Sequence, residues 1–423
     1  SSHFGSRLEG RTPRISHRLG DTIKTYVVML TSVRRLPCFA FLCVVFFFSI
    51  LALYWLATDD VQAKLNKLAI SVRDGVQAQQ RKVVVNVFDP YFNGEFGESA
   101  RVDLCDNRCT FVKASYPDAM GDDGAAATIW NGAWMGQDLY QYVSRTRKTN
   151  TWIFSYFFEC PTSHPRPLDM FGDRVDWTMT YAPTSDFPWP SGHMVDRAEC
   201  ARGYDEAAPV ADASQRPILL LGFASNCARQ RMRLWESLAS LFKPGEALLC
   251  GSCGKSCCDG RNISDDCHRR LFSKVVFFAA WENARCSGYI TEKPFRALDN
   301  GMVPLVLGGT GRVEYEQLGI ARDAFIHMQD FVSMEQLAGY MHFVQSNKSA
   351  YSNFFRWRTN KCINNALYAR AYNVTPYAER IFCPLCRELH KPYAEQKSRH
   401  TYGKSLNAWF RGTCSDNAHY SPY

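Results

Sequence analysis

Residues 275–309, VVFFAAWENARCSGYITEKPFRALDNGMVPLVLGG, constrain the fold of this chain more than any other segment. An apolar run over 275–280 stops abruptly, and an amphipathic segment opens at Tyr289 and ends at Gly301. A second apolar run follows at 303–307. This succession predicts a strand, a helix and a second, parallel strand. The polar side chains fall at the carboxyl ends of the strands, where open parallel sheets bind ligands.

The composition is that of a folded protein with room for two domains. Of the 423 residues, 46% are apolar, which is enough for two hydrophobic cores. The 49 basic and 41 acidic residues give a net charge of +8 without a block of like charges, so nucleic-acid binding is not expected. Three Asn-X-Ser/Thr sequons, the acceptor pattern for N-glycosylation of secreted chains, lie at Asn262, Asn347 and Asn373.

The 17 cysteines indicate an oxidising compartment. Close pairs occur at Cys105 and Cys109, at Cys257 and Cys258, and at Cys383 and Cys386. The cluster over 250–258 also has spacing typical of zinc ligands, and 383–386 has the spacing of a redox motif, but disulfides are the better interpretation outside the cytosol. We therefore predict disulfides that involve Cys105, Cys109, Cys253, Cys257, Cys383 and Cys386.

Residues 39–57, FAFLCVVFFFSILALYWLA, determine where we expect the protein to reside. The run is uncharged and long enough to cross a bilayer as a helix. Basic residues precede it and two aspartates follow, so residues 1–36 are expected to be a cytosolic tail and the rest lumenal. A cleaved signal peptide is the alternative, but Trp55 stands where a cleavage site has a small residue. We expect a transmembrane signal-anchor over 37–57 and a polar stem over 58–82.

Apolar and β-branched runs predict a first α/β domain over residues 83–212. The expected strands lie at 82–88, 126–130, 151–158 and 175–181. Gly- and Pro-rich segments connect them, and the polar stretch 202–216 is expected to be a linker.

A second α/β domain is predicted over residues 216–382. A strand is expected at 218–223. Apolar residues recur at helical spacing over 228–242, and Ser333 with Gln336 forms a capping box at the start of another helix. Strand and helix patterns alternate throughout, which is typical of parallel sheets. The remaining residues, 383–423, are expected to form a cysteine-containing C-terminal segment.

Three blocks within residues 281–308 carry a resemblance to a known family. They are Trp281-Glu282-Asn283, then Tyr289-Ile290-Thr291-Glu292-Lys293, then Val303-Pro304-Leu305-Val306-Leu307-Gly308. In order and spacing they resemble the donor-binding signature of the α1,3-fucosyltransferases, glycosyltransferase family 10. The resemblance implies a GT-B fold, with two facing Rossmann-like domains behind the transmembrane helix and stem. It also implies transfer of fucose from GDP-fucose, with inversion, to form an α1,3 linkage.

The end of the chain resembles one subgroup of that family. Cys383 to His390 and Trp409 to Gly412 look like segments of the invertebrate and plant enzymes that fucosylate the core GlcNAc of N-glycans. The resemblance therefore implies a GlcNAc of a glycoprotein N-glycan as acceptor, and a single-pass type II protein of the Golgi membrane. Acceptor contacts come from variable loops, so the pattern does not choose between core and antennal GlcNAc.

An anionic nucleotide sugar needs cations at its diphosphate. Arg231 matches the family pattern Arg-X-X-X-aromatic-X-X-Leu, whose arginine meets the donor phosphates, and a guanidinium bridges two phosphate oxygens well. Arg233 is the second candidate. Lys293 begins the predicted helix, where free N–H groups also favour an anion.

Further residues of the signature complete the expected donor site. By resemblance, Glu292 contacts hydroxyl groups of the fucose or ribose, and Tyr289 and Asn283 contact the donor. Glu282 is a secondary candidate that could simply support its loop. Isolated Glu-Lys pairs are usually surface salt bridges, but this pair lies within the signature.

A base must take the proton from the acceptor hydroxyl. Glu159 follows the strand predicted at 151–158, so its carboxylate is presented at a carboxyl edge of the sheet. The family has Glu-Ser-Pro at this place, with the glutamate as the proposed base, and this chain has a cysteine, Cys160, for the serine. Asp186 lies in a second segment that resembles the family, in which Ala182 replaces an arginine, and is the reserve candidate.

No Asp-X-Asp pair follows a predicted strand, so we expect no metal site and no required cofactor. A divalent ion could stimulate without being required, because Arg231 and Lys293 are expected to neutralise the diphosphate. The alternative function is a catalytically silent, membrane-tethered protein that binds a glycan or nucleotide on the same fold. The departures from the family pattern favour it, at Cys160, Ala182, Trp281 and Pro294. The two functions differ in whether Glu159, Arg231 and Lys293 converge on one cavity.

Overall fold

A computed structural model describes the chain from residue 82 onward, with gaps. The described residues are 82–88, 101–114, 124–132, 150–156, 159–162, 168–171, 173–200, 212–227, 231–258, 266–309, 311–365 and 375–414. Contacts divide the chain into two units, Ser1–Gln79 and Gln80–Tyr423, and the described residues belong to the second. The predicted tail, anchor and nearly all of the stem lie outside them. Within the described part, no helix is long and apolar enough to cross a membrane.

The N-terminal half of the described chain builds a six-stranded sheet. In spatial order its strands are β2 (Arg101–Leu104), β3 (Cys109–Lys113), β1 (Val83–Phe88), β4 (Ala127–Asn131), β5 (Thr151–Tyr156) and β6 (Trp177–Thr180). Only the β2–β3 pair is antiparallel, because a tight turn joins these two strands. Val85, Ile129 and Ile153 are fully buried at the centre of the sheet, as expected for β-branched residues on parallel strands.

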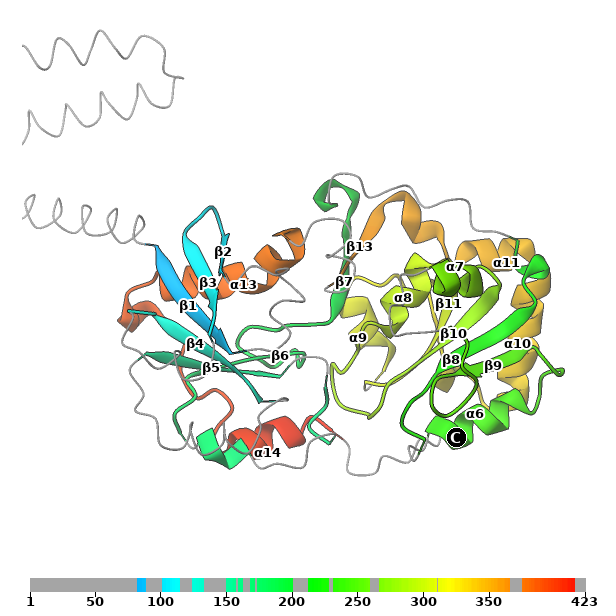
Figure 1. Cartoon of the computed structure of the whole chain (residues 1–423), viewed down its shortest axis with the longest axis horizontal. Helices are drawn as coiled ribbons and strands as arrows, with labels where there is room; N and C mark the ends of the chain where they lie inside the picture. Colours follow the sequence, from blue (N-terminus) through cyan, green and yellow to red (C-terminus); the bar gives the residue numbers. More distant parts are fainter. Residues whose placement is uncertain are drawn as a thin grey trace, which may run out of the picture. The chain divides into compact units, whose positions relative to one another are not determined.

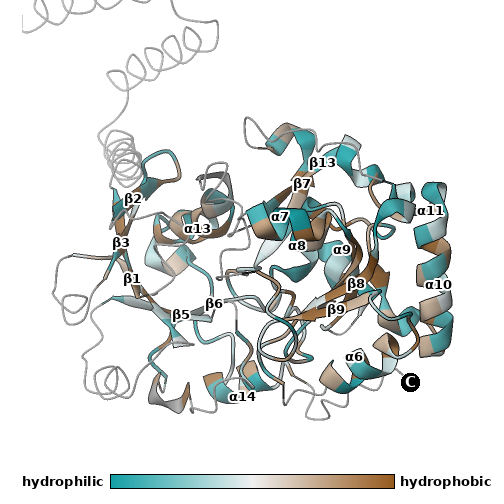
Figure 2. Ribbon diagram, turned by 45° about the vertical axis from the view of Figure 1, so that its right-hand side comes forward, coloured by the Kyte–Doolittle hydropathy of each residue, from teal (hydrophilic) through white to brown (hydrophobic). Residues whose placement is uncertain are grey.

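The second sheet has five strands, all parallel. Their order is β12 (Ile326–His327), β11 (Val303–Leu307), β10 (Val275–Trp281), β8 (Ile218–Phe223) and β9 (Ala247–Cys250). All seven residues of β10 are buried, and Figure 2 shows β8 and β9 in the brown of hydrophobic residues. In sequence order this is a 2-1-3-4-5 arrangement with the chain reversing between β8 and β10, the doubly wound pattern that binds ligands at its switch point.

Amphipathic helices cover this sheet. The helices of this half are α6 (Arg231–Ala239), α7 (Asp266–Phe272), α8 (Lys293–Asp299), α9 (Arg312–Gln317), α10 (Met334–Ser346) and α11 (Lys348–Asn353). Leu234 and Leu238 of α6, and Leu337 and Met341 of α10, enter the core formed with the strands. In Figure 2 the helix α10 carries both teal and brown, which fits a helix with one buried face.

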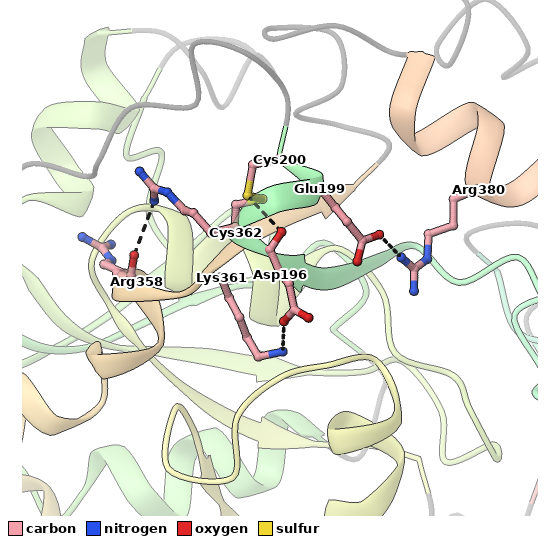
Figure 3. Close-up of a disulfide and its surroundings, with 8 residues drawn as sticks. Asp196, Glu199, Cys200, Arg358, Lys361, Cys362 and Arg380 are labelled. Atoms are coloured by element: carbon pink, nitrogen blue, oxygen red, sulfur yellow. Dashed lines mark hydrogen bonds and ion pairs between the residues drawn. A yellow bond between two sulfur atoms is a disulfide. The ribbon is translucent and has the colours of Figure 1, made fainter. Parts of the chain in front are cut away.

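Two strands lie where the chain passes between its halves. Strand β7 (Gly192–Asp196) follows the strands of the first sheet in the sequence, β13 (Lys361–Asn365) follows those of the second sheet, and the two pair antiparallel. A disulfide joins Cys200 to Cys362 beside this pair, and Lys361 contacts Asp196 at 3.4 Å (Figure 3). The two connections between the halves of the chain are therefore bonded to each other.

After β13, the helices α13 (Thr375–Leu389) and α14 (Leu406–Arg411) pack on the N-terminal half (Figure 1). Phe382 and Leu385 of α13 are fully buried in the core that contains Val85 and Ile129. The predicted boundary between residues 382 and 383 thus falls inside α13. The 3-10 helices are η4 (Leu168–Phe171), η5 (Arg197–Glu199), η6 (Ala213–Gln215), η7 (Met328–Asp330), η8 (Arg356–Thr359) and η9 (Tyr393–Glu395).

Disulfides connect segments that are far apart in the sequence. The bonds of the described residues are Cys105–Cys383, Cys109–Cys386, Cys200–Cys362, Cys227–Cys253, Cys250–Cys257, Cys258–Cys267 and Cys286–Cys414. All six cysteines predicted to form disulfides do so here. The close pairs of the sequence are not bonded within themselves, and two of them, on the β2–β3 turn and on α13, bond to each other across the fold. Cys160 is buried and takes part in no disulfide within the described part of the chain.

Most of the predicted elements are present. The first four predicted strands correspond to β1, β4, β5 and β6, and the unit predicted at 275–309 corresponds to β10, α8 and β11. Ser333 caps α10 by accepting from the Gln336 backbone N–H at 3.2 Å, but the Gln336 side chain accepts from Val332 instead of from Ser333. The strands β2, β3, β7, β9, β12 and β13 were not predicted.

We predict that Phe382→Ala destabilises the fold by about 3–5 kcal/mol, the cost of removing a buried phenylalanine from a core. Its ring lies between Phe111 and Trp189, at centroid distances of 4.9 and 5.0 Å. Urea unfolding of the full chain with its disulfides intact measures the change. Phe343→Ala, at a residue that is 51% exposed, is the matched control, and its effect should stay within about 0.5 kcal/mol. Equal effects would show that α13 does not complete the N-terminal core.

Candidate functional site

A cavity of about 490 Å³ lies at the switch point of the second sheet. It is lined by Glu159, Phe223, Ala224, Ser225, Asn226, Arg231, Phe278, Ala279, Asn283, Tyr289, Thr291, Glu292, Lys293 and Arg296. Residues 223–226 lie at the end of β8 or follow it, and the lining residues of 278–283 lie in β10 or follow it. The strand order of the sheet reverses between β8 and β10. Topology alone therefore predicts a ligand at this place. Its volume is in the range of small-molecule sites.

Glu282 organises the wall of this cavity from behind. Its carboxylate is fully buried and accepts from the Thr291 backbone N–H at 2.8 Å and from the Thr291 hydroxyl at 2.9 Å. Lys293 donates to the same carboxylate at 2.6 Å. Burial raises the pKa of Glu282, although Lys293 pulls it down. These bonds fix the loop that leads into α8, which is the supporting role considered for Glu282.

Lys293 is held at two points and still lines the cavity. Its ammonium donates to Glu282 and, at 2.6 Å, to the Thr291 hydroxyl. An ammonium has three donors, so the third remains for a ligand. Because Glu282 compensates its charge, Lys293 contributes directed hydrogen bonding more than net positive charge.

Arg231 and the neighbouring Glu292–Arg296 pair complete the polar lining. Arg231 begins α6, is buried, and donates through Nη1 to the Trp281 carbonyl at 3.3 Å. Arg296 contacts Glu292 at 3.2 Å. Burial alone would raise the pKa of Glu292, but the charges of Lys293 and Arg296 outweigh it and lower this pKa to about 2. Glu292 is therefore an anion at any pH near neutral.

Two uncharged residues of the signature face the same cavity. Asn283 follows β10, and Tyr289 is buried with its ring 5.0 Å from that of Tyr181 in the N-terminal half. Burial, with Glu282 nearby, raises the pKa of Tyr289 well above its usual range, so its phenol stays protonated and can donate.

Glu159 comes from the other sheet. It lies three residues beyond the end of β5 and lines the cavity together with Arg231 and Lys293. The two halves of the chain therefore contribute to one cavity. Cys160, which replaces a serine of the family pattern, is buried, and its sulfur lies 3.1 Å from the Thr162 hydroxyl.

Two secondary candidates lie elsewhere. Arg233 is exposed on α6 and does not line the cavity, because it is two residues from Arg231 and so points to another side of the helix. Asp186 does not line it either. Its carboxylate accepts from the backbone and hydroxyl of Thr178, at 2.8 and 2.9 Å, and from Thr401, which makes it part of a turn.

Sequence reasoning missed part of the lining. Ser225 and Asn226 follow β8, and Arg296 lies one turn into α8. Polar residues directly after the strand predicted at 218–223 were a signal for the first two. Arg296 had no signal beyond its helical spacing from Glu292.

The remaining predicted sites are covered only in part. Asn262 and Asn373 lie outside the described residues. Asn347 is partly exposed and caps α11, accepting from the Ala350 backbone N–H at 2.9 Å through Oδ1. Its side-chain nitrogen remains the atom that glycosylation would modify.

One group of potential metal ligands occurs among the described residues. Atoms of Cys109, Cys386 and His390 lie within 4.8 Å of one another. The two sulfurs are bonded to each other, so they are not available as thiolate ligands.

Comparison with known proteins gives the family. Residues 213–409 match the model of glycosyltransferase family 10 (fucosyltransferase), C-terminal part. These residues, somewhat under half of the chain, belong to glycosyltransferase family 10. This match begins just before β8 and contains all the lining residues except Glu159.

Curated relatives agree with this membership. The chain is 28% identical over 260 residues to glycoprotein 3-alpha-L-fucosyltransferase A of Drosophila melanogaster, which covers 61% of this chain and 47% of the relative. It is 28% identical over 305 residues to alpha-(1,3)-fucosyltransferase C of the same species, covering 68% and 66%. The match thus spans about half to two thirds of these relatives.

A solved structure titled as an alpha1,3-fucosyltransferase with GDP-fucose is more distant. It is 13% identical, with a TM-score of 0.46 over 74% of this chain and 91% of that one. This likeness is too low to place a ligand in the present chain.

We predict that Lys293→Met destabilises the fold by about 3–5 kcal/mol, because it leaves the Glu282 carboxylate buried without its cation. The double variant Glu282→Gln with Lys293→Met should recover most of this loss, since a neutral amide replaces the charge. Urea unfolding of the full chain measures both. Lys243→Met, at an exposed lysine, is the control and should have little effect. A double variant no more stable than the single one would contradict the importance of the ion pair.

Proposed function

We propose that the protein is an inverting α1,3-fucosyltransferase that moves fucose from GDP-fucose to a GlcNAc of a glycoprotein N-glycan. One observation carries the proposal: Glu159, from the N-terminal sheet, lines the same cavity as Arg231 and Lys293, from the second sheet. Fucose transfer needs a base opposite the groups that hold the leaving group, whereas a protein that only binds a nucleotide or glycan needs no such base. The family match and the names of the relatives support fucose transfer and the α1,3 linkage.

The diphosphate would lie against α6 and α8. Arg231 can bridge two phosphate oxygens, and Lys293 can direct its third N–H at the anion. As the bond between fucose C1 and the phosphate oxygen breaks, these donors stabilise the charge that develops on GDP. Glu292 is held as an anion and can accept hydrogen bonds from hydroxyl groups of the fucose or ribose, with Asn283 and Tyr289 as neutral neighbours.

Glu159 would act on the acceptor. Its carboxylate takes the proton from the attacking hydroxyl while the new C1–O bond forms on the face opposite the leaving group, which inverts the anomeric centre. The products are the fucosylated glycan, GDP and protonated Glu159, which then releases its proton to water.

The compartment and the acceptor complete the proposal. An apolar run at 39–57, three sequons and a disulfide-rich fold are consistent with a single-pass type II protein of the Golgi membrane with its catalytic part in the lumen. The relative named as a glycoprotein fucosyltransferase supports an N-glycan acceptor, in the core or on an antenna. The rival function, a silent glycan- or nucleotide-binding protein, would not require Glu159 in the donor cavity.

Incubation of the purified full chain with GDP-fucose and a panel of N-glycan acceptors tests the function. We expect GDP release only with a GlcNAc-bearing acceptor and an α-linked product, with core and antennal acceptors distinguished by the linkage. The protein should not accept UDP-galactose or CMP-sialic acid as a sugar donor, and equal activity with either would refute the proposal.

We predict that EDTA leaves much of the activity, because protein cations meet the diphosphate. Its complete loss, restored by manganese, would reveal a metal site.

We predict that Glu159→Gln lowers turnover by about 10²–10⁴, because glutamine keeps the size of the side chain but cannot accept the proton. Calorimetry should find GDP-fucose binding nearly unchanged. Glu236→Gln, at an exposed glutamate of α6, is the matched control and should keep normal turnover. A Glu159 variant that loses donor affinity but keeps turnover at saturation would make this residue a binding group instead of the base.

A further inference from the structure

A second cavity, of about 330 Å³, lies where the first sheet, the β7–β13 pair, α9 and α13 meet. The donor cavity lies on the other side of one stretch of chain, because Gly288 and Ile290 line the second cavity and Tyr289 between them lines the first. The ring of Tyr181 also lines the second cavity and contacts Tyr289 at 5.0 Å. The two cavities are thus separate but share a wall.

Most of the second cavity is formed by rigid apolar surface. Three prolines of the segment 183–190 line it together with Leu318, Ile381 and Pro384. Proline and aromatic side chains offer a surface on which the C–H faces of a ring can pack. Because the prolines are rigid, this wall loses little conformational entropy when a ligand binds.

A buried polar group inside this apolar lining has no partner. His193 is 5% exposed, and its Nε2 has no hydrogen-bond partner among the described residues. The ring stacks on Tyr377 at 5.9 Å, which fixes its orientation. Burial, together with Arg380, lowers the pKa of His193 to about 3, so the ring is neutral. A buried nitrogen without a partner is unfavourable, and a hydroxyl or amide of a ligand would satisfy it.

The charges around the cavity disfavour an anionic ligand. Arg380 is the one lysine or arginine among the described residues that line it, and it pairs with Glu199 at 3.2 Å (Figure 3). Glu314 also lines the cavity and accepts from the Ser287 hydroxyl at 2.8 Å. The amide of Gln317 lies at the exposed rim. A neutral ligand rich in hydroxyl or amide groups matches this set.

We propose that this second cavity binds a neutral carbohydrate, with His193, Gln317 and Glu314 meeting its hydroxyl and amide groups and the proline surface meeting its ring. The role we assign it, holding a part of the acceptor glycan away from the reacting hydroxyl, rests on the proposed function. Binding of the sugar does not, because the donor cavity contributes no group to this site.

A direct binding measurement tests carbohydrate binding in the second cavity separately from fucose transfer. The probe is a GlcNAc-terminated biantennary N-glycan titrated into the full chain, with and without saturating GDP, by saturation-transfer NMR and calorimetry. We expect binding in both conditions. Gln317→Trp should block the rim and weaken binding at least about tenfold, and His193→Phe should weaken it similarly by removing the ring nitrogens. Gln329→Trp, at an exposed glutamine outside both cavities, is the matched control.

Three results would overturn the proposal. They are displacement of the glycan by GDP, unchanged binding by Gln317→Trp, and binding of an apolar peptide in place of the glycan. Failure of the proposed function would look different, since no fucose would be transferred while the glycan still bound. If transfer occurs, Gln317→Trp should raise KM for the large glycan and leave kcat, and KM for a minimal GlcNAc acceptor, unchanged.

Discussion

The buried ion pair between Glu282 and Lys293 holds one wall of the cavity at the switch point of the second sheet. Taking a carboxylate out of water is costly, and it is tolerated here because the backbone and hydroxyl of Thr291 and the ammonium of Lys293 all donate to it. The pair therefore adds little net stability, but it fixes the entry of α8 and keeps the Lys293 side chain in the lining of the cavity. Arg296 is likewise balanced by Glu292, and Arg231 donates to the Trp281 carbonyl in the same lining.

The second requirement is that segments far apart in the sequence meet around this cavity. The helix α13 completes the core of the first sheet, and the Cys105–Cys383 and Cys109–Cys386 bonds attach it to the β2–β3 turn. The Cys286–Cys414 bond similarly ties the donor loop to the end of the chain. Glu159 lines the same cavity as residues of α8, and α13 and α14 pack on the half of the chain from which Glu159 comes.

Local chemistry made much of this fold predictable. Runs of apolar and β-branched residues located the central strands, and the unit over 275–309 combined strand, helix start and second strand in one pattern. The partners of the cysteines were not predictable, because spacing in the sequence says nothing about which turns a returning helix will reach. The position of Asp186 outside the cavity was not predictable for a related reason, because a carboxylate beside a strand can stabilise a turn as well as bind a substrate. Here its carboxylate accepts hydrogen bonds from Thr178 and Thr401.

The loop 286–291 links the two cavities mechanically. Gly288 adopts φ +71°, and a Cβ there would lie 2.4 Å from Pro183, so only glycine lets the donor loop pack this closely against the N-terminal half. The Ser287 backbone N–H donates to the Thr413 carbonyl at 2.7 Å on the same stretch. At the other end of the loop, the Thr291 backbone N–H donates to Glu282, so a shift of Tyr289 would also move Gly288 and Ile290, which line the second cavity. A ligand in either cavity therefore constrains the shape of the other through a wall one residue thick.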